Sequence, residues 1–315
     1  MKKLLFIYNP RAGQALLKPY ISDVVDLFVK AGYEVTIYPT QAYHDAYKKV
    51  KSYDASAYDL VVCSGGDGTI DEVVTAMMER EDRNPIGYIP TGTTNDFANS
   101  LHIPTDIMKG ADNAVNGCKF PCDIGSFNDD YFVYVAAFGI FTNVPYETDQ
   151  NLKNMLGHFA YLMEGAKQIL DIPSYHLKVS WDEGDVEDDF ILGMVTNSKS
   201  VGGFRKMIGN SVVFDDGLFE VTLIRTPDNI IDVNEIVAAL LMNNVNDDHM
   251  LQFSTRHIRF EAREEIPWTL DGEFGGRHHK VEVENLPRAL EIMVPEKYLH
   301  RLTNDENIEI RTMNE

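Results

Sequence analysis

The stretch Val61–Val74, VVCSGGDGTIDEVV, decides the fold of this chain. It opens with apolar residues, and the β-branched pair at 61 and 62 favours an extended backbone, which predicts a buried strand. Glycines at 65, 66 and 68 permit a tight turn, and Thr69 with Glu72 forms a capping-box pattern that predicts the start of a helix. Because amide groups at the start of a helix bind anions, this turn predicts a phosphate site.

Asp67 lies inside the same turn. A carboxylate beside phosphate groups is repelled unless a cation lies between them, so the turn also indicates Mg²⁺, bound directly or through water. The alternative from these residues alone is a strand-to-helix turn with an Asx cap.

Composition limits the classes of function. The chain has 315 residues, which favours two domains, and a net charge of −21, which argues against nucleic-acid binding. An acidic protein is also repelled by anionic lipid, so any membrane contact requires a local basic or apolar patch. The sequence contains no apolar run of about 18 residues, and its 3 cysteines form no disulfide framework. We therefore expect a cytoplasmic protein.

Strand and helix patterns alternate in the first part of the chain. Apolar runs predict strands at 3–8, 33–38, 61–63 and 86–89, with helices at 19–31, 42–53, 70–78, 96–101 and 107–115. This alternation predicts an open parallel sheet with helices on both faces. Ligands bind beyond the carboxyl ends of such strands, where the loops at 9–13, 40, 65–69 and 91–95 are expected to converge.

From about residue 126 the pattern changes to short strands. We expect them at 131–137, 175–181, 190–196, 218–225, 251–261, 268–270, 280–283 and 289–294, with helices at 152–170 and 232–243. Such runs predict an antiparallel β-sandwich. The predicted organisation is therefore a Rossmann-like α/β nucleotide-binding domain, 1–125 with 295–315, and a β-sandwich domain, 126–294.

Five motifs together resemble the catalytic domain of the diacylglycerol kinase family. They are NPRAG (9–13), SGGDGTIDE (64–72), PTGTTNDFA (90–98), DDG (215–217) and DGE (271–273). The last two are similar to the soluble bacterial diacylglycerol kinases of Gram-positive lipoteichoic-acid metabolism. The resemblance covers essentially the whole chain.

The resemblance implies an ATP-dependent kinase that phosphorylates the hydroxyl of 1,2-diacylglycerol to give phosphatidate. It implies a nucleotide site between the two domains and a lipid site on the sandwich. The predicted nucleotide contacts are Asn9, Pro10, Arg11, Ala12, Gly13, Thr40, Gly65, Gly66, Asp67, Gly68, Thr69, Ile70, Asp71, Glu72, Thr93 and Asn95.

The predicted catalytic residues are Glu273, Asp271 and Asp67. Glu273 would be the general base, since an alcohol attacking a phosphate needs a proton acceptor. Asp271 could orient the base or share a metal through water, and Asp67 could complete a cation site. The alternative for residues 271–273 is an ordinary hairpin turn, because Asp-Gly is a favoured turn pair.

The resemblance also implies a structural Mg²⁺ near the DDG turn, held by the Asp216 carboxylate and the carbonyls of Val213 and Leu218. Asp71 departs from the family pattern, which often has asparagine there. A further carboxylate near triphosphate would need a metal or an outward rotamer.

Other functions remain open from the sequence. The chain lacks GxxxxGK[ST] and is therefore not a P-loop kinase. An NAD kinase shares Gly-Gly-Asp-Gly, another lipid alcohol such as a sphingoid base or phosphatidylglycerol could be the acceptor, and an inactive nucleotide-binding regulator is a different class. The expected partners are membrane-derived diacylglycerol, a membrane touched transiently through 200–207, and a second copy of the chain in a homodimer.

Overall fold

A computed structural model describes residues 1–140, 173–197, 214–242 and 248–302. Contacts divide the chain into two compact units. Unit 1 comprises Met1–Ile124, Val213–Gly217 and Leu286–Glu315, and unit 2 comprises Gly125–Val212 and Leu218–Asn285. The chain thus returns to unit 1 at residue 286, whereas the predicted second domain extends to 294, and the short segment 213–217 belongs to unit 1 as well.

Unit 1 contains the predicted parallel sheet. Its strands are β1 (Lys2–Tyr8), β2 (Tyr33–Pro39), β3 (Leu60–Gly65) and β4 (Ile86–Pro90), in the order β4-β3-β1-β2. The last part of β13 (Glu273–Val294) extends this sheet, where Ile292 pairs in parallel with Ile86 of β4. Every residue of β3 and β4 is buried, as expected for parallel strands covered on both faces.

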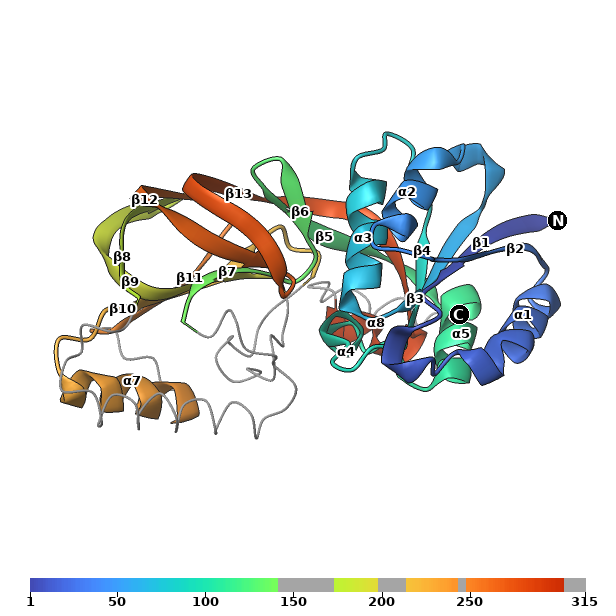
Figure 1. The fold of residues 1–315 in the computed structure, drawn as a ribbon, viewed down its shortest axis with the longest axis horizontal. Coiled ribbons are helices and arrows are strands. Elements are labelled where there is room, and N and C mark those ends of the chain that lie inside the picture. Colours follow the sequence, from blue (N-terminus) through green and yellow to red (C-terminus); the bar gives the residue numbers. More distant parts are fainter. Residues whose placement is uncertain (141–172, 198–213, 243–247, 303–315) are drawn as a thin grey trace, which may run out of the picture. The chain divides into compact units, whose positions relative to one another are not determined.

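Helices cover both faces of this sheet (Figure 1). α1 (Ile21–Lys30) packs with α5 (Ile107–Asn116) on one face, and α2 (Asp45–Ser52) packs with α3 (Asp67–Met78) on the other. The short helix α4 (Asp96–Ser100) follows β4. The helix predicted at 19–31 is divided into a 3₁₀ turn, Lys18–Tyr20, and α1.

Short helical segments complete unit 1. They are the 3₁₀ turns η1 (Ala12–Gln14), η2 (Lys18–Tyr20), η3 (Ala55–Ala57) and η5 (Glu296–Tyr298), and the helix α8 (Leu299–Leu302).

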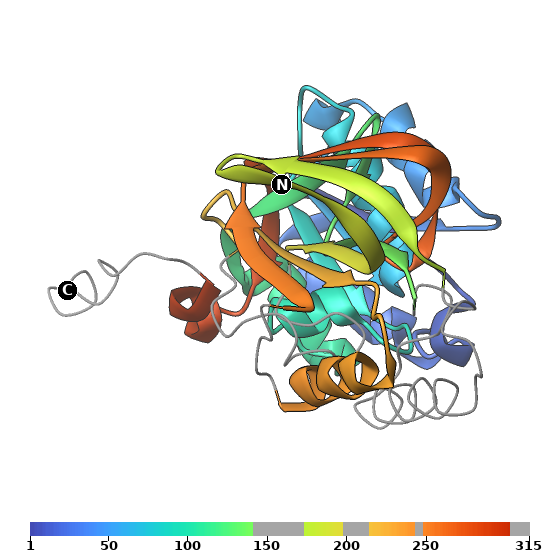
Figure 2. The ribbon, with the colours of Figure 1, turned by 90° about the vertical axis from the view of Figure 1, so that its left-hand side faces the viewer.

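Unit 2 contains the antiparallel sandwich-like domain. Its strands are β6 (Asp130–Phe132), β7 (Val135–Gly139), β8 (Tyr175–Trp181), β9 (Gly184–Thr196), β10 (Phe219–Arg225), β11 (Met250–Thr255), β12 (His257–Leu270) and the first part of β13. β5 (Cys118–Phe127) begins in unit 1 and pairs with β6 in unit 2. The sheet order β11-β10-β9-β7-β12-β13 brings together strands far apart in sequence, and the long strands curve strongly (Figure 2).

An aromatic cluster fills the core of unit 2. The ring of Trp268, which is 1% exposed, lies 4.8 Å from Phe138, 5.0 Å from Phe260 and 5.1 Å from Phe127. Aromatic side chains of this size supply much of the apolar area that is buried in the core of unit 2. α7 (Ile230–Met242) corresponds to the helix predicted at 232–243, whereas the helix predicted at 152–170 lies outside the described residues.

No helix among the described residues is long and apolar enough to cross a membrane.

Candidate active site

The predicted loops meet at the carboxyl edge of the parallel sheet in unit 1. Asn9 follows β1 and donates its backbone N–H to Ser64 O of β3 at 2.8 Å, and Thr91 follows β4 and donates to Gly65 O at 2.8 Å. Thr40 follows β2 and donates to Tyr8 O at 2.9 Å. The order of the strands therefore places the NPRAG, GGDG and PTGTT segments side by side.

Glycines allow these segments to touch through their backbones. A Cβ atom on Gly92 would lie 2.5 Å from the Cα of Gly66, and one on Gly13 would lie 2.2 Å from the carbonyl oxygen of Thr91. Gly13 also has φ +51°, a conformation that side chains disfavour. The three loops thus form one tightly packed backbone surface.

The helix that follows the glycine turn starts earlier than predicted. α3 begins at Asp67 with Gly66 at its N-cap, and no side chain caps it. The prediction that Thr69 is the N-cap is therefore wrong, because the extended Gly66 already supplies the carbonyl that accepts from the amides of Thr69 and Ile70. Moving the helix start to Asp67 brings its carboxylate to the positive end of the helix dipole.

Asp67 is a half-buried residue whose carboxylate is only partly satisfied. Its Oδ2 accepts a hydrogen bond from the backbone N–H of Asp96 at 3.3 Å, and its Oδ1 is buried without a hydrogen-bond partner among the described residues. Burial raises the pKa of Asp67, although backbone amides at 95–97 act in the opposite direction. A buried acceptor with a free oxygen is the kind of atom that a bound cation would satisfy.

The arrangement at Asp67 is suited to Mg²⁺ bound with a nucleotide. In the part of the chain that the structure describes, no three histidine, cysteine, aspartate or glutamate side chains are grouped so that they could hold a metal by themselves. Mg²⁺ in kinase sites is commonly held by one or two carboxylates together with phosphate oxygens and water, so a complete protein cage is not required. The residues present therefore fit that ion.

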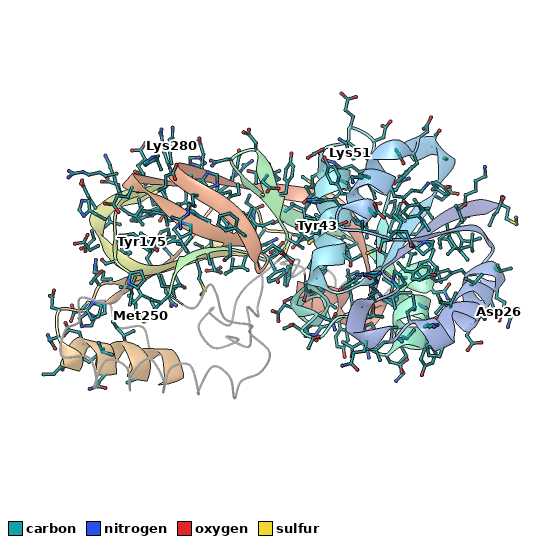
Figure 3. The ribbon with its side chains drawn as sticks, in the orientation of Figure 1. Asp26, Tyr43, Lys51, Tyr175, Met250 and Lys280 are labelled. Carbon is teal, nitrogen blue, oxygen red and sulfur yellow. The ribbon has the colours of Figure 1, made fainter. Side chains whose placement is uncertain are left out.

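Glu72 fixes the loop after β2. Its carboxylate accepts hydrogen bonds from the backbone N–H groups of His44 at 3.0 Å, Ala46 at 3.1 Å and Tyr47 at 3.4 Å, at the start of α2. The loop carries Tyr43 (Figure 3). This side chain is 69% exposed, and its ring lies 3.9 Å from that of His44. Glu72 thus holds the segment between Thr40 and α2 in place.

Several other predicted contacts shape the loops themselves. Asn95 adopts φ +52°, and its side-chain amide bonds both N and O of Gly92 at 2.9 Å, which closes the 92–95 turn. Asn9 Oδ1 accepts the backbone N–H of Arg11 at 2.9 Å. The exposed predicted contacts are Arg11 and Thr93; the half-buried ones are Asn9, Pro10, Ala12, Gly13, Gly66, Asp67, Gly68, Asp71 and Glu72; the buried ones are Thr40, Gly65, Thr69, Ile70 and Asn95.

Unit 2 carries the predicted base on a tight turn. Glu273 is the first residue of β13 and is exposed, and no hydrogen bond or ion pair joins its carboxylate to any of the described residues. Asp271, two residues earlier, is instead 5% exposed. The two predicted carboxylates of this turn therefore have very different surroundings.

Sequence reasoning missed Asp123 of β5. This residue is fully buried, its Oδ2 accepts from Gly217 N at 2.7 Å and its Oδ1 accepts from Arg288 N at 2.7 Å. Burial, with a smaller contribution from the nearby carboxylates of Asp216 and Asp215, raises the pKa of Asp123 to about 6, although the amides of Arg288 and Gly217 act in the opposite direction. The available signal was a single carboxylate between the apolar residues Cys122 and Ile124.

The predicted structural metal set is only partly described. Asp216 is exposed in the bend at 214–217, and the carbonyl of Leu218 in unit 2 accepts from Asn285 Nδ2 at 3.1 Å. Val213 lies outside the described residues, as does the membrane-contacting loop predicted at 200–207. Asp123 binds the backbone of Gly217 and so fixes the DDG turn.

Comparisons with known proteins agree with this geometry. The diacylglycerol kinase catalytic domain matches residues 3–127, and the YegS C-terminal NAD kinase beta sandwich-like domain matches residues 135–294. The chain is 33% identical to the diacylglycerol kinase of Bacillus subtilis, over 96% of this chain and 99% of that protein. It is 32% identical to the diacylglycerol kinase of Staphylococcus carnosus, over 93% and 95%.

A solved structure from Bacillus anthracis str. Sterne has the same fold. It superimposes with a TM-score of 0.79 at 25% sequence identity and covers 94% of this chain and 98% of its own.

Proposed function

This chain belongs to the diacylglycerol kinase family, and we propose that it transfers the γ-phosphate of ATP to the hydroxyl of 1,2-diacylglycerol to give phosphatidate. Such a reaction would serve phospholipid and lipoteichoic-acid metabolism by recycling diacylglycerol. The observation that carries the proposal is the backbone surface at the carboxyl edge of unit 1, where Gly13 packs against Thr91 and Gly66 against Gly92, beside the half-satisfied carboxylate of Asp67.

The reaction needs a base, positioning of the reactants and neutralisation of charge. The lipid hydroxyl oxygen forms a bond to the γ-phosphorus, the bond from that phosphorus to the β,γ-bridging oxygen breaks, and ADP leaves. The proton of the hydroxyl passes to Glu273, whose exposed carboxylate is available as a base. Phosphoryl transfer otherwise depends mainly on positioning and on neutralising charge.

Unit 1 would hold the nucleotide phosphates. The amide groups of Asp67 and Gly68, at the start of α3, are the donors that an anion would use. Mg²⁺, when bound, neutralises the phosphate oxygens, and Asp67 is the carboxylate that would hold it. We assign the second, structural Mg²⁺ to Asp216 with the carbonyls of Val213 and Leu218. In the nucleotide site, the side chain of Asp71 would turn away from the phosphates.

The lipid would reach the protein from a membrane surface. Phe274 follows the base directly and is 71% exposed, which supplies the local apolar contact that an acidic chain needs. The basic side chain of Lys280 lies on the same strand, on the outer surface of β13 (Figure 3). We therefore propose that the protein contacts membranes transiently through this surface. A cytoplasmic location and a homodimer are proposed from the family resemblance alone.

The test is transfer of labelled γ-phosphate to diacylglycerol in mixed micelles. We expect labelled phosphatidate with Mg²⁺, none with chelator, and a large loss in Asp67→Ala and Glu273→Gln. Asp26→Asn is the control, because it breaks only an exposed ion pair with Lys30. Absence of phosphatidate, with label found instead on a sphingoid base, phosphatidylglycerol or NAD, would overturn the assignment of the acceptor. ATP binding without transfer to any acceptor would favour a regulator.

A further inference from the structure

The turn that carries the predicted base has a strongly constrained backbone. Asp271 has φ +50° and Gly272 has φ +85°, and the flanking residues Leu270 and Glu273 pair directly across the hairpin. Two successive residues with positive φ are typical of the two-residue type I′ turn, in which aspartate followed by glycine is a favoured pair. Aspartate tolerates this conformation better than most residues with a side chain.

The carboxylate of Asp271 is occupied by three consecutive backbone amides. Oδ2 accepts from Val133 N at 2.6 Å, and Oδ1 accepts from Tyr134 N at 3.0 Å and from Val135 N at 2.9 Å. Successive amides that converge in this way form an anion-binding concavity. Here the anion is a side chain of the protein itself.

Two further hydrogen bonds tie the same pair of segments together. The Asp271 backbone N–H donates to Val135 O at 2.9 Å, and the Tyr134 hydroxyl donates to Asp271 O at 3.0 Å. Beyond them β12 pairs with β7, with Leu270 opposite Ala136. The turn is thus held by the carboxylate of Asp271, by the hydrogen bonds of its backbone and by the pairing of β12 with β7.

This geometry separates the roles of the two acidic residues in the turn. For Asp271 to accept a substrate proton or bind a metal directly, its carboxylate would have to give up amides that are themselves buried, which is costly. Glu273 begins only two residues later, a reach of at most about 7 Å along the chain. Fixing Asp271 therefore fixes the backbone from which the Glu273 side chain extends.

We infer that Asp271 is a positioning residue, whose carboxylate captures the 133–135 amides and thereby aims the Glu273 base. This inference rests on the proposed function, in which Glu273 accepts the proton of the lipid hydroxyl. A displacement of about 1 Å in such a group costs on the order of 100-fold in rate. Asp271→Asn keeps the size and the turn preference of the residue but turns one acceptor into a donor that faces an N–H group.

The experiment is a cycle of four proteins, with the wild type, Asp271→Asn, Glu273→Gln and the double variant assayed for transfer to diacylglycerol. We expect Asp271→Asn to lower kcat by about 100-fold and to leave KM for ATP and lipid within about two-fold. In the Glu273→Gln background the same change should cost almost nothing, since Asp271 acts through Glu273.

Asp182→Asn is the matched control. Its carboxylate also accepts backbone amides, from Arg256 at 2.9 Å and His257 at 3.2 Å. Asp182 lies between β8 and β9 and contacts His257, the first residue of β12. The Asp271 turn follows the last residue of β12, and a strand of 14 residues is about 45 Å long. The substitution Asp182→Asn should lower the thermal stability of unit 2 and leave kcat unchanged.

Each result decides a different question. No phosphatidate from the wild type refutes the proposed function, and full activity of Glu273→Gln refutes the base. If Glu273→Gln is impaired, three outcomes each overturn the positioning role. The first is a wild-type kcat in Asp271→Asn, and the second is a raised KM with a normal kcat in that variant. The third is a full additional loss of kcat when Asp271→Asn is added to Glu273→Gln. If Asp271→Asn does not fold, Tyr134→Phe, which removes the hydroxyl bond to Asp271 O, decides: kcat should fall several-fold, and an unchanged kcat overturns the inference.

Discussion

Removing the charge of Asp123 should change how the stability of unit 1 depends on pH. In the native protein this carboxylate is fully buried, and burial raises its pKa from 3.8 to about 6. Between these two values the folded state keeps a proton that the unfolded state has lost. Asp123 therefore contributes stability that is fully present below pH 3.8 and is lost as the pH rises through 6.

The size of the effect follows from the two pKa values. The full change corresponds to about 3 kcal/mol, at about 1.36 kcal/mol for each pKa unit. About 1.4 kcal/mol of it remains at pH 5 and almost none at pH 8. At about 2–4 °C for each kcal/mol, the melting temperature of unit 1 should lose about 3–6 °C between these pH values on account of this one group.

The assay compares the wild type with Asp123→Asn between pH 5 and 8 in chelator. Both tryptophans, Trp181 and Trp268, lie in unit 2, so their fluorescence reports that unit, and calorimetry is needed to follow unit 1. The fall in stability from pH 5 to 8 should be about 1.4 kcal/mol smaller in Asp123→Asn than in the wild type.

Asp59→Asn, at an exposed carboxylate that also accepts a backbone amide, is the control for the loss of one carboxylate. Parallel curves for the wild type and Asp123→Asn would refute the reasoning, because they would mean that the buried group carries the same charge in the folded and unfolded states.

Three further changes test the geometry of the site. Glu72→Gln should raise KM for ATP several-fold, since the 40–44 loop loses charge-assisted bonds worth about 1–3 kcal/mol; an unchanged KM would contradict this. Gly92→Ala should cost about 1–3 kcal/mol of stability and most of the activity, because its Cβ would lie 2.5 Å from Gly66; a normal melting curve would count against that packing. Phe274→Ser should leave the melting temperature unchanged. It should lower the rate of transfer to diacylglycerol in vesicles but not to a soluble short-chain analogue. Equal rates of the wild type and Phe274→Ser on vesicles would exclude membrane contact at this side chain.

The sequence predicted the sheet of unit 1 well because its signals are local. Apolar runs such as 86–89 and glycine turns such as 65–68 specify strand, turn and helix within a few residues. The same patterns also placed the three loops at one edge, since parallel strands share their carboxyl ends.

Features that depend on distant partners could not be predicted in this way. Glu72 matches a capping pattern within its own helix, yet it caps α2 instead. One partner of Asp123, Arg288, is 165 residues away. Residues 280–283 and 289–294 were predicted as two strands, whereas both belong to β13, which has 22 residues and includes Arg288 with φ +53°.

The division of unit 1 into separate segments has a consequence for its synthesis. Arg83, just before β4, donates to the carbonyl of Ala289, which lies 206 residues later in the chain. At about 5–20 residues per second, a ribosome needs on the order of 10–40 s to make that interval. During this time β4 has an unpaired edge and Asp123 lacks the amide of Arg288, so the nascent chain must wait, and is exposed to proteases and to other chains, until its last strand emerges.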